Sequence, residues 1–307
     1  MSLAVTSEKG AVESARSSRK SRRIALWIVY LLAIAIIAML FIDGYSYYQT
    51  PYLERPHHPD YREFRPAGSR GLLYGFVGAS MMVLMLVYTI RKRTRLFGRR
   101  IPLRPFLDFH IFMGVFGPLM IVLHTSFKVQ GLVAVAFWSM VAVALSGYFG
   151  RYLYMQVPRN IEDRELSLQE IDRLVAHMGQ ELKDKWNLKQ ETLDKINFIF
   201  DRAYGIGGKG TFGYVVRLFL SDLRRPWLRA GLKRRLKKAI PLPKKEFDYM
   251  YHLASQRAIL VRRLTVLGKV QQLFHYWHVI HKPFAIIMYI IMGVHIGVAI
   301  WTGYGWF

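Results

Sequence analysis

Four of the ten histidines in this chain lie in long apolar segments, where ionisable side chains are costly and usually functional. His110 and His124 share one segment, His281 and His295 share another, and the interval is 14 residues in both. Fourteen residues of α-helix turn through about 1400°, about 40° short of four full turns, and rise about 21 Å. Each pair therefore lies on one helix face, separated by roughly two-thirds of the ~30 Å hydrocarbon core of a bilayer.

Two such helices running in the same direction bring the histidines together at two depths. His110 and His281 then share the inner depth, and His124 and His295 share the outer depth. Imidazoles on facing helices can hold a cofactor in a bundle core, and two axial nitrogens saturate a haem iron. The pattern predicts two stacked bis-histidine haem b sites. Such sites transfer electrons and leave no open metal position for a substrate.

The chain contains no cysteine, which narrows the chemistry further. Disulfides, cysteine-ligated zinc or iron–sulfur clusters, thiol nucleophiles and thioether-attached haem are all excluded. Any metal must be held by histidine, methionine or oxygen ligands.

Five apolar runs are long enough to position the histidines across a membrane, which takes about 20 helical residues. The first, Ile24 to Ile42, is uncharged and has no small-residue cleavage site after it, so it predicts a retained signal anchor. We expect an all-α polytopic membrane bundle of about five transmembrane helices with a helical insertion. The expected divisions are a disordered basic cytoplasmic tail (1–23), the signal anchor (24–42), an outer loop (43–68), transmembrane helices two to four (69–154), a basic, mainly helical cytoplasmic insertion (155–270) and the fifth transmembrane helix (271–307).

The charge distribution predicts the orientation of these helices. Lysine and arginine number 44 against 20 acidic residues, and they concentrate in residues 1–23, 91–100 and 155–270. Cytoplasmic loops collect basic residues, and five spans place these three segments on one side. The pattern predicts a cytoplasmic N-terminus in a bacterial inner membrane. A basic chain also suits nucleic acid, but the spans favour the lipid bilayer as partner, and no nucleic-acid partner is expected.

Several charged residues flank the predicted haem sites. Arg104, Arg151 and Lys282 lie near the inner depth and Lys128 near the outer depth, where they could pair with haem propionates. The positive-inside bias explains most of these residues without a cofactor. His278 is either an alternative inner ligand, part of a quinone site, or an ordinary interfacial histidine.

Within the insertion, Ser167 and Glu170 form a capping-box pattern that predicts the start of a helix.

The two His-x13-His spans resemble the di-haem membrane cytochromes b. The nearest are the ferric-reductase and NADPH-oxidase-like transmembrane cores and the cytochrome b subunits of bacterial respiratory complexes. The resemblance covers about residues 69–154 and 275–301, through the stretches LDFH and LHTSF around His110 and His124, and WHVIHKPF and VH around His281 and His295. It implies transmembrane electron transfer between a quinol or soluble donor and an acceptor, with soluble iron–sulfur, flavin or cytochrome c proteins as partners.

Two alternatives stay open. One is a quinol-dependent or metal-reducing oxidoreductase with its own substrate site. The other is a histidine-lined metal transporter or a membrane scaffold. A transporter would more naturally combine carboxylates with histidine at one depth, and the apolar spans lack carboxylates at those positions. No flavin- or nicotinamide-binding pattern is present, which favours an electron-transfer subunit over a self-contained reductase.

Overall fold

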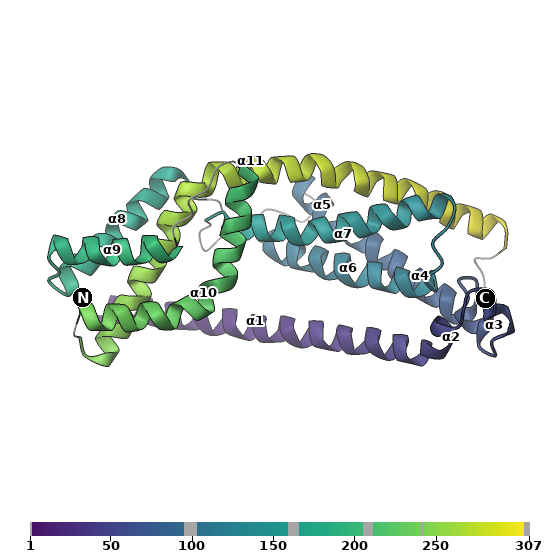
Figure 1. Ribbon diagram of the computed structural model, residues 1–307, viewed down its shortest axis with the longest axis horizontal. Helices are drawn as coiled ribbons and strands as arrows, with labels where there is room; N and C mark the ends of the chain where they lie inside the picture. The colour runs from purple at the N-terminus through teal and green to yellow at the C-terminus, as the bar shows by residue number, and fades with distance from the viewer. Residues whose placement is uncertain (1, 95–102, 159–165, 205–210, 241, 304–307) are drawn as a thin grey trace. The chain divides into compact units, whose positions relative to one another are not determined.

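The structure is a computed structural model that describes residues 2–94, 103–158, 166–204, 211–240 and 242–303. Throughout these ranges the regular elements are helices and no strand occurs, which confirms the all-α prediction. The chain divides into two units, Met1–Ala144 with Phe284–Phe307, and Leu145–Pro283. Each unit is described separately below (Figure 1).

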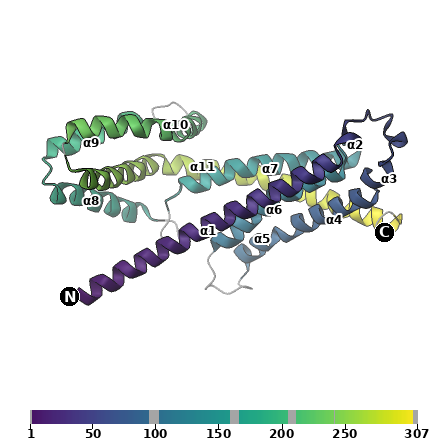
Figure 2. The same ribbon diagram turned by 90° about the horizontal axis from the view of Figure 1, so that it is seen from below.

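The first unit contains the N-terminal helices and the first part of α7. Its elements are α1 (Ser2–Asp43), α2 (Tyr45–Gln49), η1 (Arg55–His57), α3 (Tyr61–Phe64), α4 (Ser69–Leu84), α5 (Leu86–Arg93), α6 (Leu103–His124), the start of α7 (Leu132–Gln156) and the end of α11 (Lys244–Trp301). Helices α4 and α5 pack along α6 (Figure 2). The approach is close: a Cβ added at Gly117 would lie 3.2 Å from Met82 and 3.4 Å from the Gly78 carbonyl.

Five helices or helical segments are long and apolar enough to cross a membrane among the described residues, which confirms the expected number. They are Ile24–Asp43, Tyr61–Arg93, α6, α7 and α11. Many of their apolar side chains point outward, Trp27 being 70% exposed. Lipid, unlike water, accommodates such surfaces, and helices satisfy their own backbone hydrogen bonds there. The chain is accordingly an integral membrane protein in contact with the bilayer.

Three boundaries differ from the expected ones. Helix α1 begins at Ser2, so residues 2–23, for which we expected a disordered tail, continue the anchor helix. Helix α11 begins at Lys244, so the insertion enters the fifth span without a break near residue 270. Nucleating a helix is costly but extending one is not, so apolar helices propagate into helix-forming polar neighbours. The second span has the opposite difference, because it breaks at Met85 between α4 and α5.

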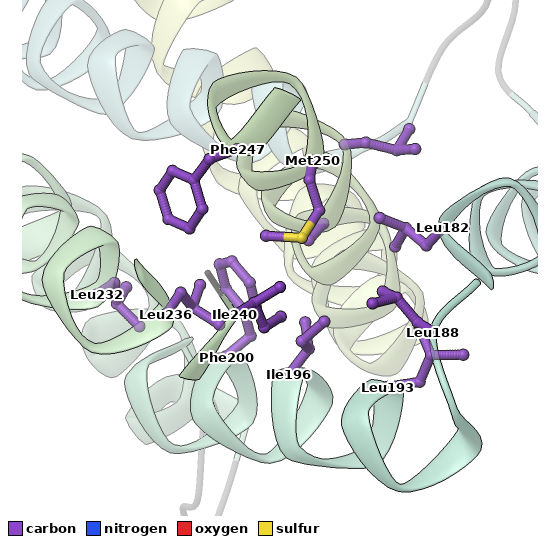
Figure 3. Close-up of a cluster of buried hydrophobic side chains, with 12 residues drawn as sticks. Leu182, Leu188, Leu193, Ile196, Phe200, Leu232, Leu236, Ile240, Phe247 and Met250 are labelled. Carbon is purple, nitrogen blue, oxygen red and sulfur yellow. The ribbon is translucent and has the colours of Figure 1, made fainter. Parts of the chain in front are cut away.

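The second unit is the helical insertion with the adjoining parts of α7 and α11. It contains α8 (Leu168–Lys185), α9 (Gln190–Tyr204) and α10 (Thr211–Ala239). The predicted capping box is present: Ser167 Oγ accepts from the Glu170 N–H, and Glu170 Oε2 accepts from the Ser167 N–H. The unit has its own apolar core between these helices and α11, including Leu182, Ile196, Phe200, Leu236, Phe247 and Met250 (Figure 3).

Candidate functional site

His124, the last residue of α6, is held by a backbone carbonyl of a neighbouring helix. Its Nδ1 lies 2.8 Å from the carbonyl oxygen of Gly71, in the first turn of α4. A carbonyl oxygen only accepts, so Nδ1 carries the proton and donates it. The Nε2 atom is then the nitrogen whose lone pair can bind a metal. Metal-ligating histidines usually have their second nitrogen fixed in this way.

Gly75 makes this orientation sterically feasible. It lies one helical turn after Gly71, and a Cβ at this position would lie 2.6 Å from Nδ1 and 2.8 Å from Cε1 of His124. Any larger residue would push the imidazole away from the Gly71 carbonyl. Gly75 is thus required for the observed position of His124.

His295 of α11 lies opposite His124 within the first unit. Their ring centres are 6.4 Å apart, with an angle of 61° between the ring planes. A metal–nitrogen bond to histidine is about 2 Å long and the ring centre lies about 1.1 Å behind the nitrogen, so two imidazoles on opposite sides of one metal would have ring centres about 6.2 Å apart. This separation, in the pair that we name the outer site, matches the spacing at which two imidazoles would hold one metal ion.

The turn that follows His124 is locked by the outer loop. Ser126 and Phe127 have positive φ angles of 48° and 62°, which non-glycine residues adopt only when the surroundings hold them there. Arg55 donates from Nη1 to the Ser126 carbonyl (2.6 Å) and from Nη2 to the Tyr48 carbonyl (2.9 Å). Arg55 therefore supports the C-terminal end of α6, a contribution that the sequence did not predict.

His110, earlier on α6, has the same kind of partner as His124. Its Nδ1 lies 3.0 Å from the carbonyl oxygen of Met85. That carbonyl is accessible because the helix breaks there: the N–H of Tyr88 approaches it only to 3.4 Å. The unexpected break in the second span thus creates the acceptor that orients His110.

His281 lies in the second unit, where it is oriented by a side chain of α7. Its Nδ1 is 2.8 Å from Ser146 Oγ, and its ring centre is 4.6 Å from that of Trp277. A Cβ at Gly150 would lie 2.3 Å from the Trp277 ring, so the indole packs directly on that glycine. His110 and His281 belong to different units, and their pairing as an inner site stays a prediction.

The basic residues expected to pair with propionates have varied surroundings. Arg104 is exposed. The guanidinium of Arg151 lies 5.6 Å from the centre of the Tyr154 ring, and Lys128 Nζ lies 4.5 Å from that of Tyr52. Their role toward a cofactor stays a prediction.

His278 and Lys282 line a pocket of about 290 Å³ in the second unit. The Nδ1 atom of His278 lies 2.8 Å from the carbonyl of Phe274 on its own helix. Both histidine and lysine can donate hydrogen bonds into such a pocket. The full lining is Val157, Gln271, Phe274, His275, His278 and Lys282.

No family model matches the chain, and no match to a curated protein or to a solved structure was found. The fold defines an integral membrane helical protein, and within its first unit His124 and His295 lie together. The functional conclusion therefore depends on the residues and their geometry.

Proposed function

We propose that the chain is a membrane electron-transfer subunit that binds two stacked bis-histidine b-type haems and passes electrons across the membrane within a larger redox complex. The observation that carries this proposal is the outer pair, whose ring centres are 6.4 Å apart while Nδ1 of His124 is engaged by Gly71. In the proposed assembly His124 and His295 hold the outer haem, and His110 and His281 hold the inner haem.

The donor set fits a haem better than a bare metal ion. Two histidines would supply two ligands to the iron, and the haem would bring the remaining ligands with it, whereas a bare metal ion would need them from the protein. Bound haem b supplies one-electron iron chemistry. In the outer pair this chain orients the His124 imidazole through the Gly71 carbonyl and places the exposed His295 opposite it, on a helix apolar enough to span a membrane. Three of the four proposed ligands have an Nδ1 partner: Gly71, Met85 and Ser146.

The proposed setting is a bacterial inner membrane with the N-terminus in the cytoplasm, as the distribution of basic residues favours. The proposed partners are redox subunits: soluble iron–sulfur, flavin or cytochrome c proteins. In this assignment the protein belongs to a respiratory chain and transfers electrons between its partner proteins.

The test is the haem content of the purified full chain, produced with an adequate haem supply. Pyridine haemochrome analysis should give about two b-type haems per chain, with a matching reduced-minus-oxidised spectrum. A folded, haem-supplied preparation without haem would contradict the proposal. His177→Ala is a matched control, because His177 is an exposed histidine on α8, and it should leave the content unchanged.

The pocket around His278 favours a second candidate function, a quinol-dependent oxidoreductase. Its size is near the lower limit for small-molecule sites, and it combines the aromatic Phe274 with His275, His278 and Lys282 as hydrogen-bond donors. Reduction of the haems by a short-chain quinol in the isolated subunit, lost in His278→Ala with haem content retained, would support it. If a chain with its full haem content is not reduced by quinol, the protein transfers electrons between partners and does not oxidise quinol itself.

A further inference from the structure

Helix α10 has one face packed on the protein and an opposite face that is apolar but exposed. The packed face carries Leu218, Leu232 and Leu236, all at most 5% exposed. At 100° per residue, the four exposed side chains before Pro226 fall within an arc of about 100° on the face opposite Leu218, and Trp227 follows directly after the proline. They range from 40% exposed for Val216 to 73% for Trp227. We name this set the α10 stripe: Val216, Phe219, Leu220, Leu223 and Trp227.

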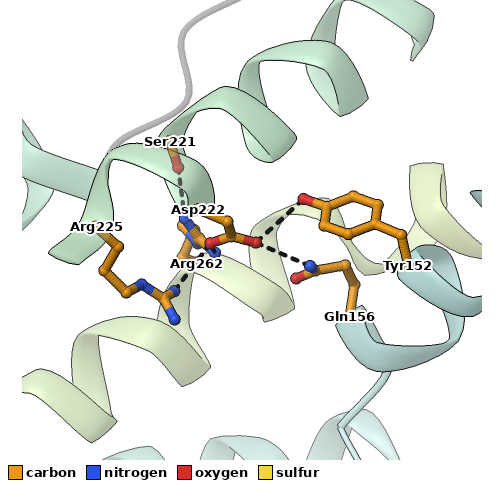
Figure 4. A network of polar contacts seen from close by, with 6 residues as sticks. All are labelled: Tyr152, Gln156, Ser221, Asp222, Arg225 and Arg262. Atoms are coloured by element: carbon orange, nitrogen blue, oxygen red, sulfur yellow. Dashed lines mark hydrogen bonds and ion pairs between the residues drawn. The ribbon is translucent and has the colours of Figure 1, made fainter. Parts of the chain in front are cut away.

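A polar network places the α10 stripe at the end of a membrane span. The hydroxyl of Tyr152 donates to Asp222 Oδ2 (3.1 Å), and Gln156 Nε2 donates to the same oxygen (2.9 Å) (Figure 4). The rings of Tyr152 and Phe219 also meet edge to face, with centres 5.3 Å apart. Helix α7 is apolar enough to span a membrane and ends at Gln156. Residues 219–222 therefore lie level with the end of α7, where a bilayer surface is expected.

The positive charge of α10 suits a position at the surface of a bilayer that contains anionic lipids. The helix has nine lysines and arginines and a single acidic residue, Asp222. Asp222 is engaged by Arg262 and Arg225 within the protein, so it does not offset the exposed basic residues. Arg217 and Arg224 are exposed beside the α10 stripe. Basic residues near an anionic lipid surface are attracted to its phosphate groups.

We propose that α10 lies in the membrane interface at this end of α7, with its stripe inserted at the boundary between headgroups and acyl chains. The arginines beside the stripe contact the phosphate groups of anionic phospholipids. Helices of this type combine a hydrophobic face with lysine and arginine on the polar face, and tryptophan is enriched at this depth. The bilayer is the occupant, because the Asp222 network holds the stripe at a depth where lipid is present. This inference is independent of haem binding.

Because the sequence contains no cysteine, a single introduced cysteine can be labelled specifically, which allows a direct test. A nitroxide spin label is attached to Leu223→Cys in the full chain, in nanodiscs of phosphatidylcholine alone or mixed with phosphatidylglycerol. Collision with apolar oxygen and with a water-soluble nickel chelate reports the depth of the label. His177→Cys, exposed on α8, is the aqueous control, and Trp227→Cys is a second position within the stripe.

We expect labels at Leu223 and Trp227 to favour oxygen over nickel and to report a depth of about 5–10 Å in the headgroup and acyl boundary. Phosphatidylglycerol should increase that depth, and Arg217→Gln with Arg224→Gln should reverse the increase. If the spin label lies at the same depth in both lipid compositions, anionic headgroups do not contribute to the insertion of the stripe. Nickel access equal to that at His177→Cys would overturn insertion. Shielding from both reagents would overturn it as well and indicate a protein partner on the stripe.

Discussion

Replacing Gly75 with alanine tests whether His124 is held as the structure shows. The added Cβ would lie 2.6, 2.8 and 3.0 Å from Nδ1, Cε1 and Cγ of the His124 ring. The ring can move away only by giving up its 2.8 Å hydrogen bond to the Gly71 carbonyl. Overpacking costs about 1–3 kcal/mol, and the lost hydrogen bond costs about 1 kcal/mol. Alanine normally stabilises a helix interior by about 1 kcal/mol over glycine.

The net expectation is a loss of roughly 1–3 kcal/mol at the outer site, equivalent to about 5- to 150-fold weaker haem retention. The assay is the haem content per chain together with the rate of haem transfer to an apoprotein acceptor. Gly268→Ala in α11 is the matched control, because its Cβ meets no atom of the described residues within 4 Å. If Gly75→Ala retains both haems as firmly as Gly268→Ala, the proposed orientation of His124 is wrong.

Three further predictions concern residues that support the fold and the sites. Ser146→Ala removes the Nδ1 partner of His281, so the midpoint potential of one haem should shift in a redox titration while the other stays constant; two unchanged potentials would contradict this role. Arg55→Met removes hydrogen bonds to loop carbonyls and should destabilise the outer site by about 1–3 kcal/mol, seen as earlier thermal loss of one haem; simultaneous loss of both haems would count against it. Burial raises the pKa of Asp222, but the hydrogen bond and charge of Arg262 outweigh it and hold the pKa below the ordinary 3.8. The ionised carboxylate therefore contributes stability above pH 3.8 that is lost as the pH falls through the lower native pKa. Asp222→Asn should lower stability in thermal unfolding more at neutral pH than in strong acid, where the carboxyl is protonated in both states; an equal loss at both pH values would contradict the role.

The spans and the histidine intervals were predictable because both are one-dimensional patterns. Apolar runs of sufficient length indicate membrane helices, and a 14-residue interval defines a shared helix face. Pairing His124 with His295 additionally required that their helices run in the same direction. The alternation of basic and non-basic loops supplied that direction, and the structure brings these two rings together.

The partners of the histidine Nδ1 atoms were not predictable from residue types. Gly71 and Met85 contribute backbone carbonyls, which every residue has, and only the three-dimensional packing determines which carbonyl accepts. The helix break at Met85 has no proline or glycine at that position to signal it. Ser146 was the one detectable signal, as a polar side chain within an apolar run. The α10 stripe also has helical spacing in the sequence, but the basic residues and Pro226 obscured it.

The most direct test of the central claim is whether His124 and His295 hold the same haem. Haem content and the reduced-minus-oxidised spectrum are compared for His124→Ala, His295→Ala, the double variant and His110→Ala, with His177→Ala as the control. We expect each outer-site variant to lose one haem, the double variant to lose no more than either single variant, and His110→Ala to lose the other haem. Loss of both haems only in the double variant, or full retention in either single variant, would contradict a shared outer haem.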